Sequence, residues 1–150
     1  MLKLSRKTLL ALEAVIDIAF NARPEPVQAK EITARQGVPQ RYLEQVMQQL
    51  VRAGILKGVR GPRGGYRLAK ERRRISVGDI VRAAELADDE IAEEAPPQSE
   101  LGLHIVAPFV QSLQVDLLAR LDAITVEELC QQARSAGVTG SDRTSADFAI

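Results

Sequence analysis

The stretch from Pro39 to Leu68 reads PQRYLEQVMQQLVRAGILKGVRGPRGGYRL, and it decides the expected fold. Its first part repeats apolar residues at helical spacing: Leu43, Val46, Met47 and Leu50. Long polar side chains repeat at the same spacing on the other side: Arg41, Glu44, Gln45 and Gln48. The pattern predicts a helix with one face in the core and an outer face whose side chains can donate and accept hydrogen bonds.

The second part of the stretch predicts a β-hairpin directly after this helix. Ala53-Gly54 ends the helix, and Ile55–Arg60 and Gly65–Ala69 read as two short strands. The loop between them is rich in glycine, which permits positive φ angles and close backbone approach. Arginines lie at or beside its tip: Arg60, Arg63 and Arg67. Such a hairpin is typical of a wing that enters a DNA minor groove. It does not match a nucleotide-binding loop, because no Lys-Ser or Lys-Thr pair follows it.

Two further helices are predicted before the stretch and one after it. Ala29–Gln36 forms a short helix ended by Gly37, and Pro39 opens the next one, which together predict a helix-turn-helix. Ser5 opens the first helix of the chain, and cations in its first turn, among them Lys7, favour an anion bound there. Arg72-Arg73-Arg74 extends the expected basic surface, and a capping box at Ser76 starts a fourth helix.

The net charge of the 150-residue chain is zero, but the charges are separated along it. Residues 1–82 hold 12 Arg and 5 Lys against 7 acidic side chains, a net of +10. Residues 83–150 hold 3 basic and 13 acidic side chains, a net of −10. A half this basic and this rich in arginine is typical of a protein that meets phosphate. The acidic half cannot bind DNA and must have another role.

The composition excludes several other classes of protein. With 2 Tyr, 3 Phe and no Trp, the chain has almost no stacking platform for single-stranded nucleic acid. One cysteine excludes a disulfide framework and a cysteine-only zinc or iron–sulfur site within a single chain. Glu13 and Asp17 interrupt the apolar run 9–20, so we expect no membrane span, no signal peptide and a cytoplasmic protein. No nucleophile–base pair or cofactor loop indicates an enzyme.

The acidic half predicts a loop and two helices. Residues 85–100 gather seven acidic side chains around Pro96-Pro97, without the regular spacing of metal ligands. Pro108 to Asp122 predicts a long helix that is apolar on nearly two sides, so it must be buried against its own domain and against a second copy. The candidate interface residues are Phe109, Val110, Leu113, Leu117, Leu118 and Leu121. A second capping box at Thr125 opens the last helix.

These motifs resemble the Rrf-type family of bacterial winged-helix transcriptional regulators, which includes IscR, NsrR and CymR. The most specific motif is Val59–Leu68, and the resemblance extends from about residue 2 to residue 136. The other matching motifs are Leu4-Ser5, Lys30-Glu31-Ile32, Gln36-Gly37-Val38, Tyr42–Gln45, Ala53–Leu56, Val77–Val81 and Ile124–Leu129. The resemblance implies a mainly α fold with a small β-hairpin wing, in which a winged helix-turn-helix domain carries a long C-terminal dimerisation helix. It also implies a homodimeric regulator, expected to be a repressor, that binds a palindromic operator in double-stranded DNA.

The resemblance assigns roles to individual residues. Tyr42, Glu44 and Gln45 match the recognition helix, and Arg60 with Gly61-Pro62 matches the minor-groove wing. Chemically, Glu44 can accept a hydrogen bond from a cytosine amine and Gln45 can pair with adenine, although Glu44 can also be an ordinary exposed helix charge. Arg41 and Arg63 depart from the residues common in the family, so the preferred operator is expected to differ. The candidate DNA-contacting residues are Lys7, Lys30, Gln40, Arg41, Tyr42, Glu44, Gln45, Gln48, Arg60, Gly61, Pro62, Arg63, Gly64, Gly65 and Arg67.

The candidate sensor departs further from the family. Cluster-binding members carry three closely spaced cysteines before the long helix, and this chain has none there. His104 lies about where the last of them would be, but one histidine cannot hold an iron–sulfur cluster, so we expect neither a cluster nor another metal. A packing role is the simpler interpretation of His104, and the apolar surroundings of Cys130 favour a core role over redox sensing. The signal is expected to be a small-molecule effector, a metabolic enzyme partner, or oxidation of Cys130.

The predicted organisation has four parts. Residues 1–84 form the winged helix-turn-helix domain, 85–105 an acidic flexible loop, 106–136 the dimerisation helices, and 137–150 a disordered tail. The competing hypothesis is a winged-helix module that binds proteins and regulates a metabolic enzyme or complex without DNA. DNA binding that weakens steeply with salt favours the first hypothesis.

Overall fold

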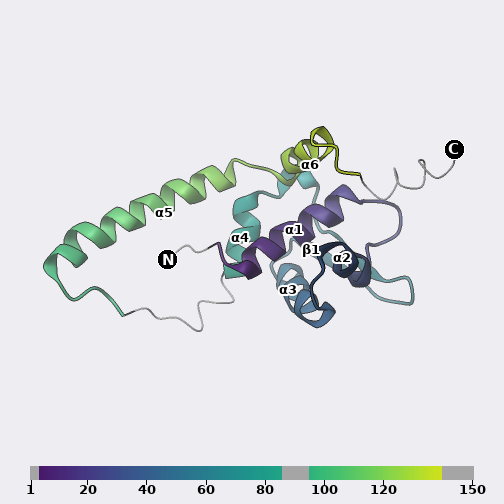
Figure 1. The fold of residues 1–150 in the computed structure, drawn as a ribbon, viewed down its shortest axis with the longest axis horizontal. Helices are drawn as coiled ribbons and strands as arrows, with labels where there is room; N and C mark the ends of the chain where they lie inside the picture. The colour runs from purple at the N-terminus through teal and green to yellow at the C-terminus, as the bar shows by residue number, and fades with distance from the viewer. Residues whose placement is uncertain (1–3, 86–94, 140–150) are drawn as a thin grey trace.

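The computed structural model describes residues 4–85 and 95–139. These residues form, in order, α1 (Arg6–Phe20), α2 (Ala29–Gln36), α3 (Gln40–Arg52), β1 (Leu56–Val59), β2 (Gly65–Leu68), the 3₁₀ turn η1 (Arg72–Arg74), α4 (Val77–Glu85), the π-helical segment η2 (Gly102–Val106), α5 (Ala107–Asp122) and α6 (Val126–Ser135). A helical body holds all of these except η2 and most of α5, which run out to the left (Figure 1). The predicted mainly α fold with a β-hairpin is confirmed.

Local signals set the ends of the first helices. The Ser5 hydroxyl accepts a hydrogen bond from the Thr8 N–H at 3.3 Å and caps α1. Gly37 ends α2 with a φ of 69°, a left-handed conformation that glycine adopts without a steric penalty. Glu31 accepts from the Gln28 N–H at 2.8 Å at the start of α2, and its carboxylate also pairs with Arg23 at 2.7 Å. Both ends of α2 are therefore fixed by residues close to them in the sequence.

One apolar core joins the helices of the body. The apolar face of α3 is completely buried, and α1 contributes Ala11, Ala14, Val15 and Ile18. Val126 and Cys130 of α6 belong to the same core, because α6 packs along α1. Of the segment 106–136, predicted to hold the dimerisation helices, α6 therefore lies in the globular body, while most of α5 lies outside it (Figure 1). The sequence pattern of an apolar helix face cannot distinguish a partner in the same chain from one in a second copy.

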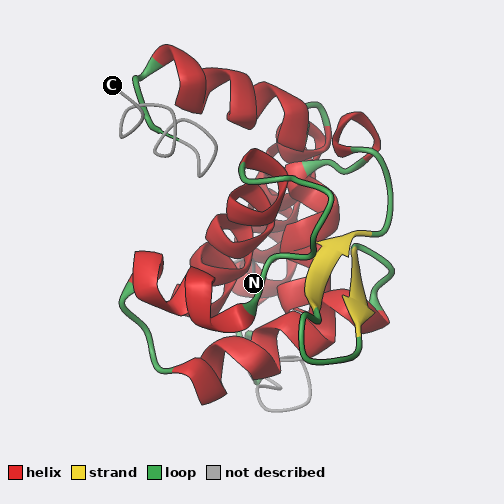
Figure 2. Ribbon diagram, turned by 90° about the vertical axis from the view of Figure 1, so that its right-hand side faces the viewer, coloured by secondary structure: helices red, strands yellow, loops and turns green. Residues whose placement is uncertain are grey.

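The hairpin packs at one edge of the helical body (Figure 2). β1 and β2 are antiparallel, and Leu56 pairs with Leu68 while Val59 pairs with Gly65. Val27, in the connector between α1 and α2, adds a bridge to Tyr66 through two backbone hydrogen bonds of 2.8 and 3.0 Å. The connector therefore holds the wing against the helix-turn-helix.

The long helix is uncovered within the chain. The helix begins at residue 100, so the loop that the sequence predicted for 85–105 ends earlier than expected. Residues 86–94 of that loop lie outside the described residues, as do residues 140–150 of the predicted tail. The end of α5 packs on α4, but no α5 side chain is buried. Residues 102–122 are long and apolar enough to cross a membrane, with a mean hydropathy of 1.2 and nothing buried, although length and composition alone are weak support for a span.

Candidate nucleic-acid interface

The outer face of α3 is available for contact. Leu43, Val46, Met47 and Leu50 are 0% exposed, which turns the polar stripe outward. Gln40, Arg41, Gln45 and Gln48 are exposed, and Tyr42 and Glu44 are half-buried. The predicted separation of a core face from a polar face is confirmed for this helix, because the apolar spacing leaves only one way for it to pack.

Neighbouring groups surround the Glu44 carboxylate. The Gln40 side-chain amide donates a hydrogen bond to Glu44 Oε1 at 3.1 Å, one turn earlier on the same helix. Tyr66 lies close on the wing, and burial together with the charge of Glu44 raises the pKa of its hydroxyl. Glu44 therefore sits where α3 meets the hairpin, rather than on the far side of the helix.

Glycines shape the tip and the base of the wing. Gly61 has a φ of 115°, and its carbonyl accepts from the Gly64 N–H at 2.9 Å to close the turn. A Cβ on Gly64 would lie 2.3 Å from the Val59 carbonyl oxygen, and one on Gly65 would lie 2.3 Å from the carbonyl oxygen of Val27. These two glycines, predicted as DNA contacts, have a steric role inside the protein.

The arginines of the wing differ in whether they bind another part of the protein. Arg60, Pro62 and Arg63 are exposed around the tip. Arg67 lies on β2, and its guanidinium donates to the Pro24 carbonyl oxygen in the connector. Sequence reasoning missed this pairing because Pro24 is far away in the chain. Arg67 therefore ties the hairpin to the body.

One shallow depression brings α3 and the wing together. Its lining includes Glu44 of α3, Arg60 at the tip, Tyr66 on β2 and Ala29 at the start of α2, around a volume of about 310 Å³. Lys30 is the next residue of α2 and is exposed. A single ligand seated here would touch both the helix and the wing.

A second depression joins α3 to the start of α1. Its volume is about 410 Å³, and it is lined by Ser5, Arg6, Lys7, Tyr42, Gln45, Val46 and Gln49. The cations in the first turn of α1 therefore lie beside two residues predicted for the recognition helix. Arg6 was not predicted as a DNA contact, although it lies in the same turn as Lys7 and lines the same depression.

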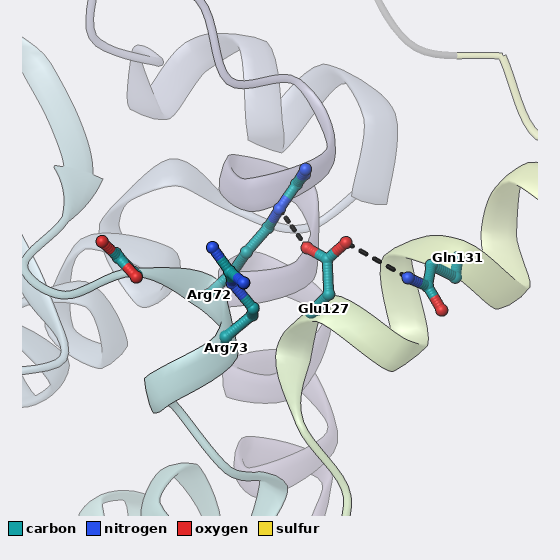
Figure 3. A pocket seen from close by; sticks show the side chains of 5 residues that line it. Arg72, Arg73, Glu127 and Gln131 are labelled. Carbon is teal, nitrogen blue, oxygen red and sulfur yellow. Dashed lines mark hydrogen bonds and ion pairs between the residues drawn. The ribbon is translucent and has the colours of Figure 1, made fainter.

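The triple arginine, predicted to extend the basic surface, lies away from the tip of the wing. η1 follows the open end of the hairpin, opposite the tip, and packs against α6. Figure 3 shows Arg72 paired with Glu127, which also accepts from Gln131 at 3.3 Å, with Arg73 beside them. In the sequence, Arg72–Arg74 follow the wing arginines closely. In the fold, the length of the hairpin separates them from Arg60 and Arg63 at its tip.

The two candidate sensors differ in exposure. Cys130 is 0% exposed, and burial raises the pKa of its thiol even though Arg72 lies close enough to lower it. His104 is exposed on η2. Within residues 4–85 and 95–139, no group of three or more His, Cys, Asp or Glu side chains is arranged to hold a metal ion. The structure does not bring the two residues together.

Comparison with known proteins supplies the family. The model of the Rrf2 family, described as an iron-dependent transcriptional regulator, matches residues 4–132. The HTH-type transcriptional regulator IscR of Vibrio campbellii is 31% identical over 153 residues, covering 99% of this chain and 88% of the relative. IscR of Escherichia coli is 31% identical over 148 residues, covering 95% of this chain and 89% of the relative.

Solved structures agree with the sequence relatives. T. potens IscR matches with a TM-score of 0.72 at 31% identity, covering 95% of this chain and 96% of that structure. CymR of B. subtilis, described as the global cysteine regulator, matches with a TM-score of 0.67 at 30% identity, covering 88% of this chain and 98% of that structure. The winged-helix architecture is thereby confirmed. The chain belongs to the Rrf2 family of DNA-binding transcriptional regulators and is not an enzyme.

Proposed function

We propose that this protein is a homodimeric, cytoplasmic repressor that recognises a palindromic operator and does not use a cysteine-ligated iron–sulfur cluster. Each protomer places α3 in a major groove and the tip of the hairpin in the adjacent minor groove. Repression is the expected consequence, because a dimer seated on promoter DNA blocks access to it.

The observation that carries this proposal is the depression shared by Glu44 and Arg60. A carboxylate on a recognition helix can read a cytosine amine, and an arginine at a hairpin tip suits a narrow minor groove. Because one depression holds both, a single duplex can satisfy both. Base-edge contacts come from α3, while the tip and the first turn of α1 meet the phosphates and the minor groove.

Dimerisation is supported by the uncovered surface of α5. Its large apolar side chains stay exposed, from 73% for Leu101 at its approach to 61% for Phe109 and 51% for Leu113. An apolar surface of this extent on a soluble protein marks an interface. Packing the same helix of a second copy against it gives a self-complementary, two-fold contact.

A membrane is the weaker partner for this helix. Asp116 and Arg120 lie within the 21-residue apolar segment. A charged side chain costs ~3 kcal/mol at the centre of a bilayer and less toward its surface, so Asp116 carries the larger part of the cost. In a soluble dimer both side chains can stay at the edge of the interface, in water.

Independence from a cluster is supported by the donor set. The family description includes iron, but the chain has one cysteine, and that thiol is enclosed in the core. Iron–sulfur clusters need several thiolate or imidazole ligands. Neither Cys130 nor exposed His104 is part of such a set among the described residues. The signal is therefore expected to act through another chemistry, such as a small-molecule effector or an enzyme partner.

The test compares two arginines at opposite ends of the hairpin. Binding sites are first selected from a random-sequence duplex pool. The affinity for the best site is then measured by fluorescence anisotropy from about 50 to about 300 mM salt. With several phosphate contacts, this affinity should fall about tenfold or more over that range. Arg60→Ala should weaken binding and reduce the slope of log affinity against log salt by ~1.

The matched control is Arg73→Ala, which removes the same charge from exposed η1. It should leave the slope unchanged, because exposed charges are screened beyond ~8 Å at physiological salt. Equal effects of the two substitutions would contradict the wing assignment. A flat salt response of the wild type, with no selected site, would instead favour a protein-binding module.

A further inference from the structure

Two segments far apart in the sequence run antiparallel where α5 meets the body. We call residues 72–82 and 122–127 the α4–α5 joint. The Val77 N–H donates to the Ile124 carbonyl at 2.8 Å, and the Val126 N–H donates to the Ile75 carbonyl at 2.9 Å. Ser76 and Thr125 form the bridge between these two bonds. Backbone pairing therefore fixes the segment that links α5 to α6 against the start of α4.

Both bridging residues also begin helices. The Ser76 hydroxyl accepts from the Asp79 N–H at 3.0 Å and caps α4, while Thr125 accepts from the Glu128 N–H at 3.2 Å and caps α6. The reciprocal bonds, from the Ser76 and Thr125 N–H groups to the carboxylates of Asp79 and Glu128, are both 3.1 Å. Because the two capping boxes lie side by side, the backbone bridge fixes the first turn of α4 relative to the first turn of α6. The joint therefore has little freedom to bend.

The last turn of α5 lies directly on the first turn of α4. A Cβ on Gly78 would lie 1.9 Å from Asp122 Oδ1 and 3.2 Å from the Asp122 backbone nitrogen. A Cβ at this position would therefore force the Asp122 carboxylate to move. Arg82 then binds the same carboxylate, with Nη2 at 2.5 Å from Asp122 Oδ2, and holds the pKa of Asp122 below its usual value. Asp122 therefore packs against the backbone of Gly78 on one side and binds the guanidinium of Arg82 on the other.

Beyond the joint, α5 is a lever. It has 16 residues, so at 1.5 Å per residue it extends about 24 Å, and most of it lies clear of the body (Figure 1). A tilt of about 10° at the joint moves the far end by about 4 Å, which is about one base-pair step along DNA. In a two-fold dimer the second protomer adds the same displacement.

We propose that the α4–α5 joint sets the angle between α5 and the DNA-reading helix, and thereby the distance between the two operator half-sites that a dimer can bind. Gly78, Arg82 and Asp122 are positioning residues for this distance, and they touch no base. The inference rests on the proposed dimeric DNA binding, and it adds a specificity determinant outside the recognition surface.

The experiment selects operators with the full-length protein and two joint variants. A random-sequence duplex pool is enriched separately with the wild type, Gly78→Ala and Arg82→Ala, and the bound sites are sequenced. Each variant should recover the same half-site sequence as the wild type, because α3 and the wing are untouched. The separation of half-sites should shift or spread by about one base pair or more. A residue that only stabilised the fold would lower recovery without changing the separation.

One control matches the Arg82 variant in chemistry. Arg35→Ala breaks another arginine–aspartate pair, between α2 and Asp17 of α1, whose Nη2–Oδ1 distance is 2.6 Å. It should recover the wild-type separation. Sedimentation velocity and circular dichroism confirm that each variant is a folded dimer.

The outcomes separate this inference from the proposed function. Joint variants that are folded dimers and recover the wild-type separation would overturn the inference alone. A wild type that selects no paired half-sites would overturn the dimeric function and the inference with it. If Gly78→Ala does not fold, the result for Arg82→Ala tests the inference. The side chain of Arg82 is exposed and lies outside the core, so its removal should leave the protein folded.

Discussion

Cys130 is enclosed where α6 meets α1. Its side chain is 0% exposed, and removal from water raises the pKa of the thiol more than the nearby Arg72 lowers it. The thiolate is the reactive form of cysteine, so both burial and protonation oppose oxidation. A single buried thiol in this setting acts as a small apolar side chain.

We therefore expect Cys130 to react slowly in the folded protein. Modification by a disulfide reagent at pH 7.5 should be ~100-fold slower than in urea, because only opened molecules react. The rate should rise with pH well above neutrality, since a raised pKa delays formation of the thiolate. Rapid, stoichiometric modification of the folded protein at neutral pH would instead make this residue a redox sensor.

At the scale of an element, the hairpin depends on two glycines in different surroundings. Gly65 faces the Val27 backbone so closely that a Cβ would lie 2.3 Å from its carbonyl oxygen. Gly58, opposite Tyr66 in the same hairpin, has open space. The bridge from the connector therefore sets the sequence requirement at Gly65 but not at Gly58.

Gly65→Ala should destabilise the protein by about 2 kcal/mol, because the backbone of the connector must move. Gly58→Ala should change the free energy of unfolding by less than ~0.5 kcal/mol. Urea unfolding followed by circular dichroism measures both values. Similar unfolding midpoints for the two variants would mean that the connector does not pack against the hairpin as described.

Local sequence patterns predicted most helices and strands, but they did not predict which distant segments pair with each other. Ser5, Gly37 and Thr125 mark helix ends because caps act within three or four residues. The pairing of Val27 with Tyr66 and of Arg67 with Pro24 joins segments about 40 residues apart, and no periodicity encodes such a partner. For the same reason the sequence did not reveal the Pro24 partner of Arg67, whose predicted DNA contact stays a prediction.

At the scale of the whole molecule, α5 is the main surface that the fold leaves uncovered. Its neighbour in the chain, α4, covers only part of one side, and large apolar side chains extend along the rest. Such a surface is stable in water only when a second surface covers it. In the proposed dimer, α5 would supply the interface and connect it to the body that carries α3 and the wing.

Leu113→Asp should convert the dimer to a monomer. A charge buried without a partner at the centre of the interface costs several kcal/mol, so the dissociation constant should rise roughly a hundredfold or more. The control is Gln132→Asp, which places the same charge on an exposed position of α6. Sedimentation equilibrium gives both constants. An unchanged constant for Leu113→Asp would place the dimer interface elsewhere.

The packing of α6 on α1 has a consequence for how the protein is made. Val126 and Cys130 complete a core whose first members lie in the opening helix of the chain. In a nascent chain, α3, α4 and β2 can already pack on α1, but the part of α1 that α6 covers stays open until α6 has emerged from the ribosome. Contacts between such distant segments slow folding, because the intervening chain must be ordered first. Truncation after residue 84 would give a fragment without Val126 and Cys130, so the core under the DNA-reading part is complete only once α6 has been made.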